Sequence, residues 1–134
     1  MSAGTIAGIA ASAISTGADV YRMGKLDAAD EARFDDWIGD FHLSAADLHV
    51  KVDKESYDGA KGVWRCVLVD DRNSKASISV ERRTETLCRT RIDVGWFGSE
   101  PTARLILARV RQHEHAASQN PPTTRPDPER QSPL

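Results

Sequence analysis

The residues best suited to chemistry by type and spacing are four arginines in one short stretch, Arg82, Arg83, Arg89 and Arg91. Arg89 and Arg91 are two positions apart in an alternating segment, so they share one face of a strand. If the preceding segment pairs with that strand as a hairpin, the four guanidinium groups form a basic patch for phosphates or anionic headgroups. Three acidic residues stand among them, which favours ordinary cross-strand pairing as the competing interpretation: Glu81, Glu85 and Asp93.

The other reactive side chains form no recognisable catalytic or metal-binding pattern. His113 and His115 would point to different sides of a helix, and their place near its C-terminus suits the helix dipole. The sequence contains no Gly-rich phosphate loop, serine nucleophile elbow or zinc-ligand spacing. We therefore expect no catalytic, cofactor or metal site, and a protein that is not an enzyme.

Length and composition predict a single domain. The chain has 134 residues and a formal net charge of −2, which gives no global preference for nucleic acid or acidic membranes. Cys66 and Cys88 fall in two predicted strands and could be buried thiols or one disulfide. In a simple meander another strand would separate them, too far for a disulfide, which favours two unreactive core cysteines.

Alternating and apolar segments predict the strands that would hold the arginines. Leu87–Val94 is a predicted strand with alternation from Cys88 onward, and Ile78 and Val80 mark the strand before it. Val63–Val69 is apolar on both faces, which indicates a central or doubly covered strand. Two earlier strands are predicted over Val20–Leu26 and Leu48–Val52.

Two amphipathic helices are expected to cover this sheet. The first has Asp27 as N-cap, and the second follows residue 99. Acidic residues should take the solvent face of the first helix: Asp35, Asp36 and Asp40. The apolar stripes are Phe34, Trp37, Ile38 and Phe41 in the first helix and Ala103, Ile106, Leu107 and Val110 in the second. The order β-α-β-β-β-β-α predicts an α+β fold, with an antiparallel sheet and both helices packed on one face.

A structural corner is predicted between the last strand and the second helix. Gly95 and Gly98 suit a sharp bend, and Trp96 and Phe97 could wedge the strand against the helix. Ser99 is a good N-cap for the helix that follows.

The two ends of the chain differ in composition from this domain, which we expect to span residues 19–116. Residues 1–18 carry no charge, and small residues recur every fourth position: Gly4, Gly8, Ser12 and Thr16. This segment is interpreted as a flexible lead-in, a remnant behind a removed signal, or a membrane-proximal helix. Residues 117–134 are rich in proline and are expected to be disordered.

Taken together, the chain resembles a family of small bacterial lipoprotein-like proteins whose domain has no known function. The resemblance covers about Gly17 to His113, and its most specific part is Val94-Gly95-x-Phe97-Gly98. The other matching residues are Tyr21, Gly24, Leu26, Phe34, Trp37, Ile106 and Val110. Such proteins carry a signal and a lipidated cysteine ahead of an Ala/Gly-rich stretch like Ile6–Ala18. That cysteine is missing here, so either the chain begins after it or this member is not lipidated.

The resemblance implies a place in the cell envelope or periplasm and no catalytic residues. We expect a non-enzymatic, envelope-associated binding or structural module with a protein partner, and with membrane association through its N-terminal segment. The alternative is a cytoplasmic adaptor or regulatory protein that binds another protein through the acidic helix or the basic hairpin.

Overall fold

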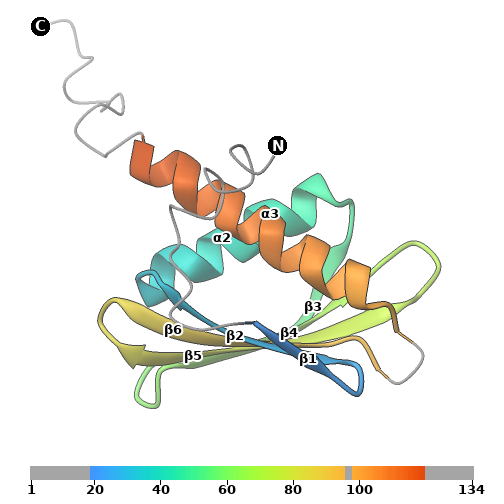
Figure 1. Cartoon of the computed structure of the whole chain (residues 1–134), viewed down its shortest axis with the longest axis horizontal. Coiled ribbons are helices and arrows are strands. Elements are labelled where there is room, and N and C mark those ends of the chain that lie inside the picture. The colour runs from blue at the N-terminus through green and yellow to red at the C-terminus, as the bar shows by residue number, and fades with distance from the viewer. Residues whose placement is uncertain (1–18, 96–97, 120–134) are drawn as a thin grey trace, which may run out of the picture.

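Six strands and two helices make up the part of the chain that the computed structural model describes, residues 19–95 and 98–119 (Figure 1). In chain order they are β1 (Val20–Arg22), β2 (Lys25–Glu31), α2 (Phe34–Asp47), β3 (Lys51–Asp58), β4 (Val63–Val69), β5 (Lys75–Thr84), β6 (Leu87–Asp93) and α3 (Glu100–Gln119).

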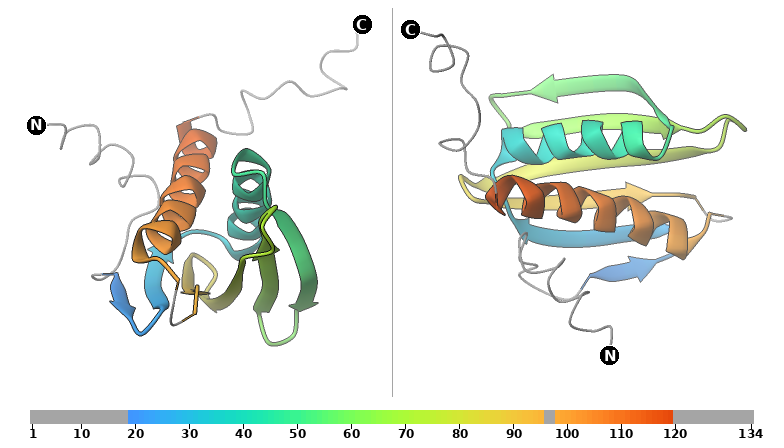
Figure 2. Two further views of the ribbon diagram at one scale, coloured as in Figure 1. Left: turned by 90° about the vertical axis from the view of Figure 1, so that its right-hand side faces the viewer. Right: turned by 90° about the horizontal axis from the view of Figure 1, so that it is seen from above.

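All strands belong to one antiparallel sheet in the order β1-β2-β6-β5-β4-β3. The helices α2 and α3 lie side by side on one face of this sheet (Figure 2). The predicted α+β class and the antiparallel sheet with both helices on one face are confirmed. No described element covers the opposite face, which we call the outer face.

The core forms where the strands' inward side chains meet the two helices. On β4 the inward residues Trp64, Cys66 and Leu68 are buried, while the outward valines are only half-buried. The strand therefore has neighbours on both edges but a helical cover on one face alone. Trp37 is fully buried, and its indole N–H donates to the Thr90 hydroxyl at 2.9 Å. Each large apolar side chain buried here contributes roughly 1.5–3 kcal/mol of transfer free energy.

The predicted first strand is a hairpin, and the predicted N-cap at Asp27 is wrong. Met23 and Gly24 both have positive φ, at 53° and 84°, which is the geometry of a tight hairpin turn between β1 and β2. Asp27 then pairs with Arg91 within β2, in register with β6. Pairing with β6 overrides the helical propensity of this stretch, and α2 begins only at Phe34.

The prediction that Asp40 faces solvent is also wrong. Helix α2 packs against α3 as well as against the sheet, so its buried surface is wider than one apolar stripe. Asp40 and Ser44 lie on the second flank and are buried together with Phe34, Trp37 and Phe41. The helix continues to Asp47, beyond the predicted fraying at residues 42–44. Leu48 is its C-cap, and His49 follows with a positive φ of 57°.

The corner before α3 is held by close backbone approach. A Cβ on Gly24 would lie 2.2 Å from the Gly95 carbonyl oxygen, and one on Gly98 would lie 2.0 Å from that of Val94. The Val94 N–H donates to the Gly24 carbonyl at 2.8 Å, and Ser99 Oγ accepts the Thr102 N–H at 3.2 Å. The bend therefore has no room for side chains at these glycines. The wedge predicted for Trp96 and Phe97 lies outside the described residues.

The expectations for the chain ends also lie largely outside the described residues, because these begin at residue 19. Helix α3 runs to Gln119, so the expected domain boundary at residue 116 falls within a helix.

Candidate functional site

The outer face carries two of the predicted arginines at its centre. Arg89 donates to Asp27 through Nε at 3.0 Å and Nη2 at 2.7 Å, and Arg91 reaches the same carboxylate through Nε at 3.3 Å. Hydrogen bonds from Arg89 are the largest cause that lowers the pKa of Asp27 below its ordinary value. A single carboxylate thus serves two guanidinium groups, and the basic charge is only partly neutralised.

The other two arginines separate at the end of β5. Arg83 lines the same outer depression as Arg89 and Arg91, and it forms an exposed ion pair with Glu81 at 2.8 Å. Arg82 projects to the helix-covered side, where its guanidinium lies 5.6 Å from the Phe34 ring centroid. The four arginines therefore do not form one patch.

Arg65 is the basic residue of this face that the sequence pattern missed. Strand register places Arg65 opposite Ser79, and Ser79 opposite Arg91. Depressions of about 130 and 340 Å³ lie along this row, and all three residues line both of them. Arg65 has no ion pair or side-chain hydrogen bond among the described residues. We call Arg65, Ser79 and Arg91 the basic row.

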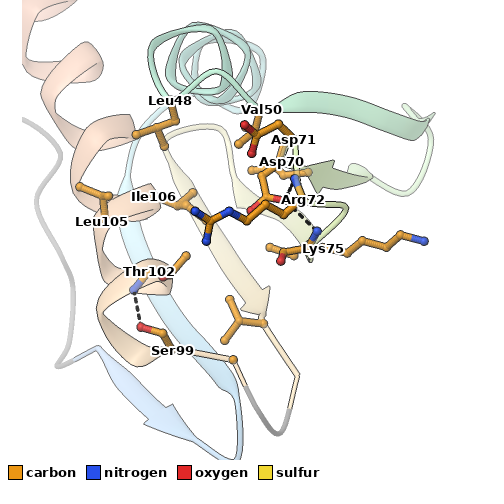
Figure 3. A pocket seen from close by; sticks show the side chains of 15 residues that line it. Leu48, Val50, Asp70, Asp71, Arg72, Lys75, Ser99, Thr102, Leu105 and Ile106 are labelled. Atoms are coloured by element: carbon orange, nitrogen blue, oxygen red, sulfur yellow. Dashed lines mark hydrogen bonds between the residues drawn. The ribbon is translucent and has the colours of Figure 1, made fainter.

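A pocket of about 600 Å³ opens at one end of the molecule, between α2, α3 and the β4–β5 turn (Figure 3). Its base is formed by the buried side chains of Leu68, Ala76 and Ile106. Leu48 and Leu105 extend the apolar lining toward the mouth, where Leu105 is half exposed. We call this cavity the end pocket.

The mouth of the end pocket is polar. Asp70 Oδ1 accepts the backbone N–H groups of Arg72 and Ser74 at 2.9 and 2.7 Å, which fixes the β4–β5 turn. Figure 3 shows the Arg72 side chain extending toward Ile106 and α3, whereas Lys75 points away. The Arg72 side chain has no ion pair or hydrogen bond among the described residues. It is thus a cation held beside an apolar cavity.

Two buried carboxylates contact α3 in different ways. Asp30 on β2 receives Arg111 Nε at 2.6 Å and Nη2 at 2.9 Å, and the same guanidinium donates to Asp19 at 2.8 and 3.0 Å. Burial raises the pKa of Asp30, while the hydrogen bonds and charge of Arg111 oppose that rise. Two edges of the Arg111 guanidinium are thus occupied, one by Asp30 and one by Asp19. This cluster stabilises the fold and leaves little room for a ligand.

The second carboxylate, Asp40, faces another acid, Glu114 on α3. Burial raises the pKa of Asp40 to about 9, and the hydrogen bond and charge of Glu114 add to that rise. One buried oxygen of each residue, Asp40 Oδ2 and Glu114 Oε1, has no hydrogen-bond partner. At neutral pH Asp40 is therefore protonated, and it is a poor general base.

Two of the four histidines, His42 and His113, contact acidic residues. His42 Nε2 lies 2.7 Å from Glu55 Oε2, which also accepts the Trp64 indole N–H at 2.7 Å. A bulge at Lys54, with φ of 49°, shifts the register of β3 and turns Glu55 toward α2. His113 lies 2.5 Å from Asp47, so it joins α3 to α2. None of these pairs lines the end pocket or the depressions of the outer face.

Cys66 and Cys88 are buried free thiols in β4 and β6, with β5 between them, as predicted. Burial raises the pKa of both thiols to about 12, so neither is a reactive nucleophile.

The part of the chain that the structure describes shows neither a metal site nor a membrane-spanning helix. Its His, Cys, Asp and Glu side chains include no group of three or more that could hold a metal ion. Neither of its helices is long and apolar enough to cross a membrane.

Comparison with known proteins identifies a family without a known activity. No curated protein matches the chain. A family model described as "Protein of unknown function (DUF3568)" matches residues 1–113, a range that contains all six strands, α2 and most of α3. The chain therefore belongs to this family of unknown function.

Proposed function

We propose that this protein is a non-enzymatic binding module of the bacterial cell envelope, and that its outer face binds the phosphate groups of anionic phospholipids. The observation that carries the proposal is the basic row, in which unpaired Arg65 and partly paired Arg91 flank the Ser79 hydroxyl. The envelope location is supported by the lipoprotein-like resemblance and by the predicted membrane-proximal segment, residues 1–18.

The geometry of the basic row suits a phosphate. Directly opposed residues on neighbouring strands have Cβ atoms about 5 Å apart, so Arg65 and Arg91 stand roughly 10 Å apart with Ser79 between them. Two long guanidinium side chains can close on one phosphate from both sides, while the hydroxyl donates from below. Arg22 and Lys25 on the β1–β2 hairpin add positive charge on the same face.

An enzymatic function has less support. The buried carboxylates are occupied by Arg111 or protonated, and the cysteine thiols are buried. Serine and threonine hydroxyls line the end pocket beside Asp70 and Asp71, but among the described residues no hydrogen bond joins any of these hydroxyls to a histidine or carboxylate side chain.

Vesicle co-sedimentation of the full chain tests the lipid proposal. We expect binding to vesicles that contain phosphatidylglycerol, weaker binding at high salt, and little binding to phosphatidylcholine alone. Replacing Arg65 and Arg91 with Ser should weaken binding about tenfold or more, since each basic residue near an anionic surface contributes about 1 kcal/mol. Arg104→Ser, at an exposed position of α3, is the single-site control and should change binding less than about twofold. Equal losses in Arg104→Ser and in the Arg65→Ser/Arg91→Ser variant, or salt-independent binding to both vesicle types, would contradict the proposal.

The location is tested separately by fractionation of the full-length native gene product. We expect it in the envelope fraction, released by detergent. Recovery in the cytoplasmic fraction together with an acidic protein partner would instead support the adaptor alternative.

A further inference from the structure

The end pocket is independent of the basic row, because it lies at the end of the helix layer rather than on the outer face. Its volume of about 600 Å³ falls within the range of about 300–1,000 Å³ that is typical of small-molecule sites. Its base is buried and apolar, and its mouth is polar. Such a cavity selects ligands with two chemically different ends.

The apolar end of a ligand would contact Leu68, Ala76 and Ile106. These three side chains are almost completely buried, so they form a fixed floor rather than an adaptable surface. Leu48, from the C-terminal end of α2, and Leu105, from the first turns of α3, line the way out. An unbranched hydrocarbon chain between these walls would shield the exposed part of Leu105 from water.

The polar end would meet Arg72. The Asp70 turn holds the backbone of Arg72 in place, and its side chain extends over the cavity (Figure 3). On the α3 side, Ser99 and Thr102 present hydroxyl groups at the same mouth. A single guanidinium fork matches a carboxylate, which carries one charge on two coplanar oxygens.

We propose that the end pocket binds a medium- or long-chain carboxylate, with the hydrocarbon chain on Leu68, Ala76 and Ile106 and the carboxylate on Arg72. The rim carboxylates do not block this arrangement. Asp70 Oδ1 accepts two backbone N–H groups of the turn, and Figure 3 shows the Asp71 side chain directed toward α2 while Arg72 extends toward α3.

The test is calorimetric titration of the full chain with decanoate, below the concentration at which decanoate aggregates. Decanol, which lacks the charge, and acetate, which lacks the chain, are titrated in parallel. We expect decanoate to bind at least about tenfold more tightly than decanol, and acetate not to bind, because chain and headgroup both contribute. Equal affinities for decanoate and decanol, or no decanoate binding, would overturn the proposal.

Two variants locate the site. Arg72→Ser should weaken decanoate binding about tenfold and leave decanol binding unchanged, since only the headgroup contact is removed. Leu105→Glu should weaken both ligands, because a charge replaces part of the apolar wall at a position that is 49% exposed. The control is Arg104→Ser. It also removes one arginine, but from α3 at the position before Leu105, which does not line the pocket. Decanoate binding that is insensitive to Arg72→Ser would contradict the assignment.

Decyl phosphate distinguishes the two anionic headgroups. Tighter binding of decyl phosphate than of decanoate, lost in Arg72→Ser, would overturn the choice of a carboxylate. Loss of decanoate binding in the Arg65→Ser/Arg91→Ser variant would show that the amphiphile binds the outer face, and would also overturn the proposal.

Discussion

Asp30 and Asp40 are both buried and both contact α3, yet their partners are opposite in charge. Asp30 meets the Arg111 guanidinium, whereas Asp40 meets the carboxyl group of Glu114. The first contact keeps charge inside the protein by pairing it, and the second avoids charge by keeping a proton. The contact of β2 with α3 therefore depends on an ion cluster, and the contact of α2 with α3 depends on protonation.

The largest effect should come from removing the cation of the first contact. Arg111→Met keeps much of the side-chain volume but leaves Asp30 and Asp19 without their shared partner. We expect the free energy of unfolding to fall by about 3–5 kcal/mol, because a buried charge then lacks compensation. Urea denaturation followed by circular dichroism measures the change. A loss below about 1 kcal/mol would show that the cluster is dispensable.

A double variant distinguishes loss of the Asp30–Arg111 ion pair from the cost of a buried charge that has no partner. In Asp30→Asn/Arg111→Met the buried charge disappears together with its partner, and we expect recovery of about 2 kcal/mol or more of the single-variant loss. The measurement is a double-mutant cycle that includes Asp30→Asn alone. Additive losses would mean that the two side chains do not act as a pair.

Removing the ionisable group at position 40 should stabilise the protein. In the folded state the pKa of Asp40 is raised to about 9, from an ordinary value of 3.8, so the folded protein binds the proton more tightly than the unfolded chain. Stability from this group is therefore full at acidic pH and falls as pH rises between those two values. Asp40→Asn removes that dependence, and we expect a gain of about 1–2 kcal/mol near pH 8. The check is urea denaturation of both proteins across this pH range; an unchanged slope against pH would contradict it.

The smallest effect should come from an exposed ion pair. Arg83→Ser breaks the contact with Glu81, in which both side chains are about half exposed. We expect a change below about 0.5 kcal/mol, because exposed pairs gain little over hydration. Thermal unfolding of the two proteins measures it, and a larger loss would show that charge on the outer face also supports the fold.

Local patterns in the sequence predicted the parts of the fold that depend on neighbouring residues. The stripe of Phe34, Trp37 and Phe41 and the alternation of Cys88, Thr90 and Ile92 are both buried as expected. Residues 27–31 resemble a helix start, because Asp27 suits an N-cap and acidic residues suit the first turn. The strand forms instead through pairing with β6, about 60 residues away.

The candidate sites depend on distant residues and were harder to predict. Arg89 and Arg91 were found by their spacing, but Arg65 becomes their neighbour only through the register of β4, β5 and β6. Likewise, Asp30 and Arg111 are 81 positions apart, so no local pattern predicts that Asp30 is buried. The end pocket combines the ends of α2 and α3 with a turn, and none of these segments carries a recognisable motif.

The close approach of Gly24 to Gly95 links two short motifs that are about 70 residues apart in the sequence. The hairpin turn carries the first glycine, and the bend into α3 carries the second. Because the space between them excludes even a methyl group, a larger residue at position 24 cannot be accommodated by rotating a side chain; the path of the chain into α3 would have to move. The Tyr-x-x-Gly-x-Leu and Val-Gly-x-Phe-Gly patterns are thus two parts of one contact, and a redesign of either segment has to rebuild both.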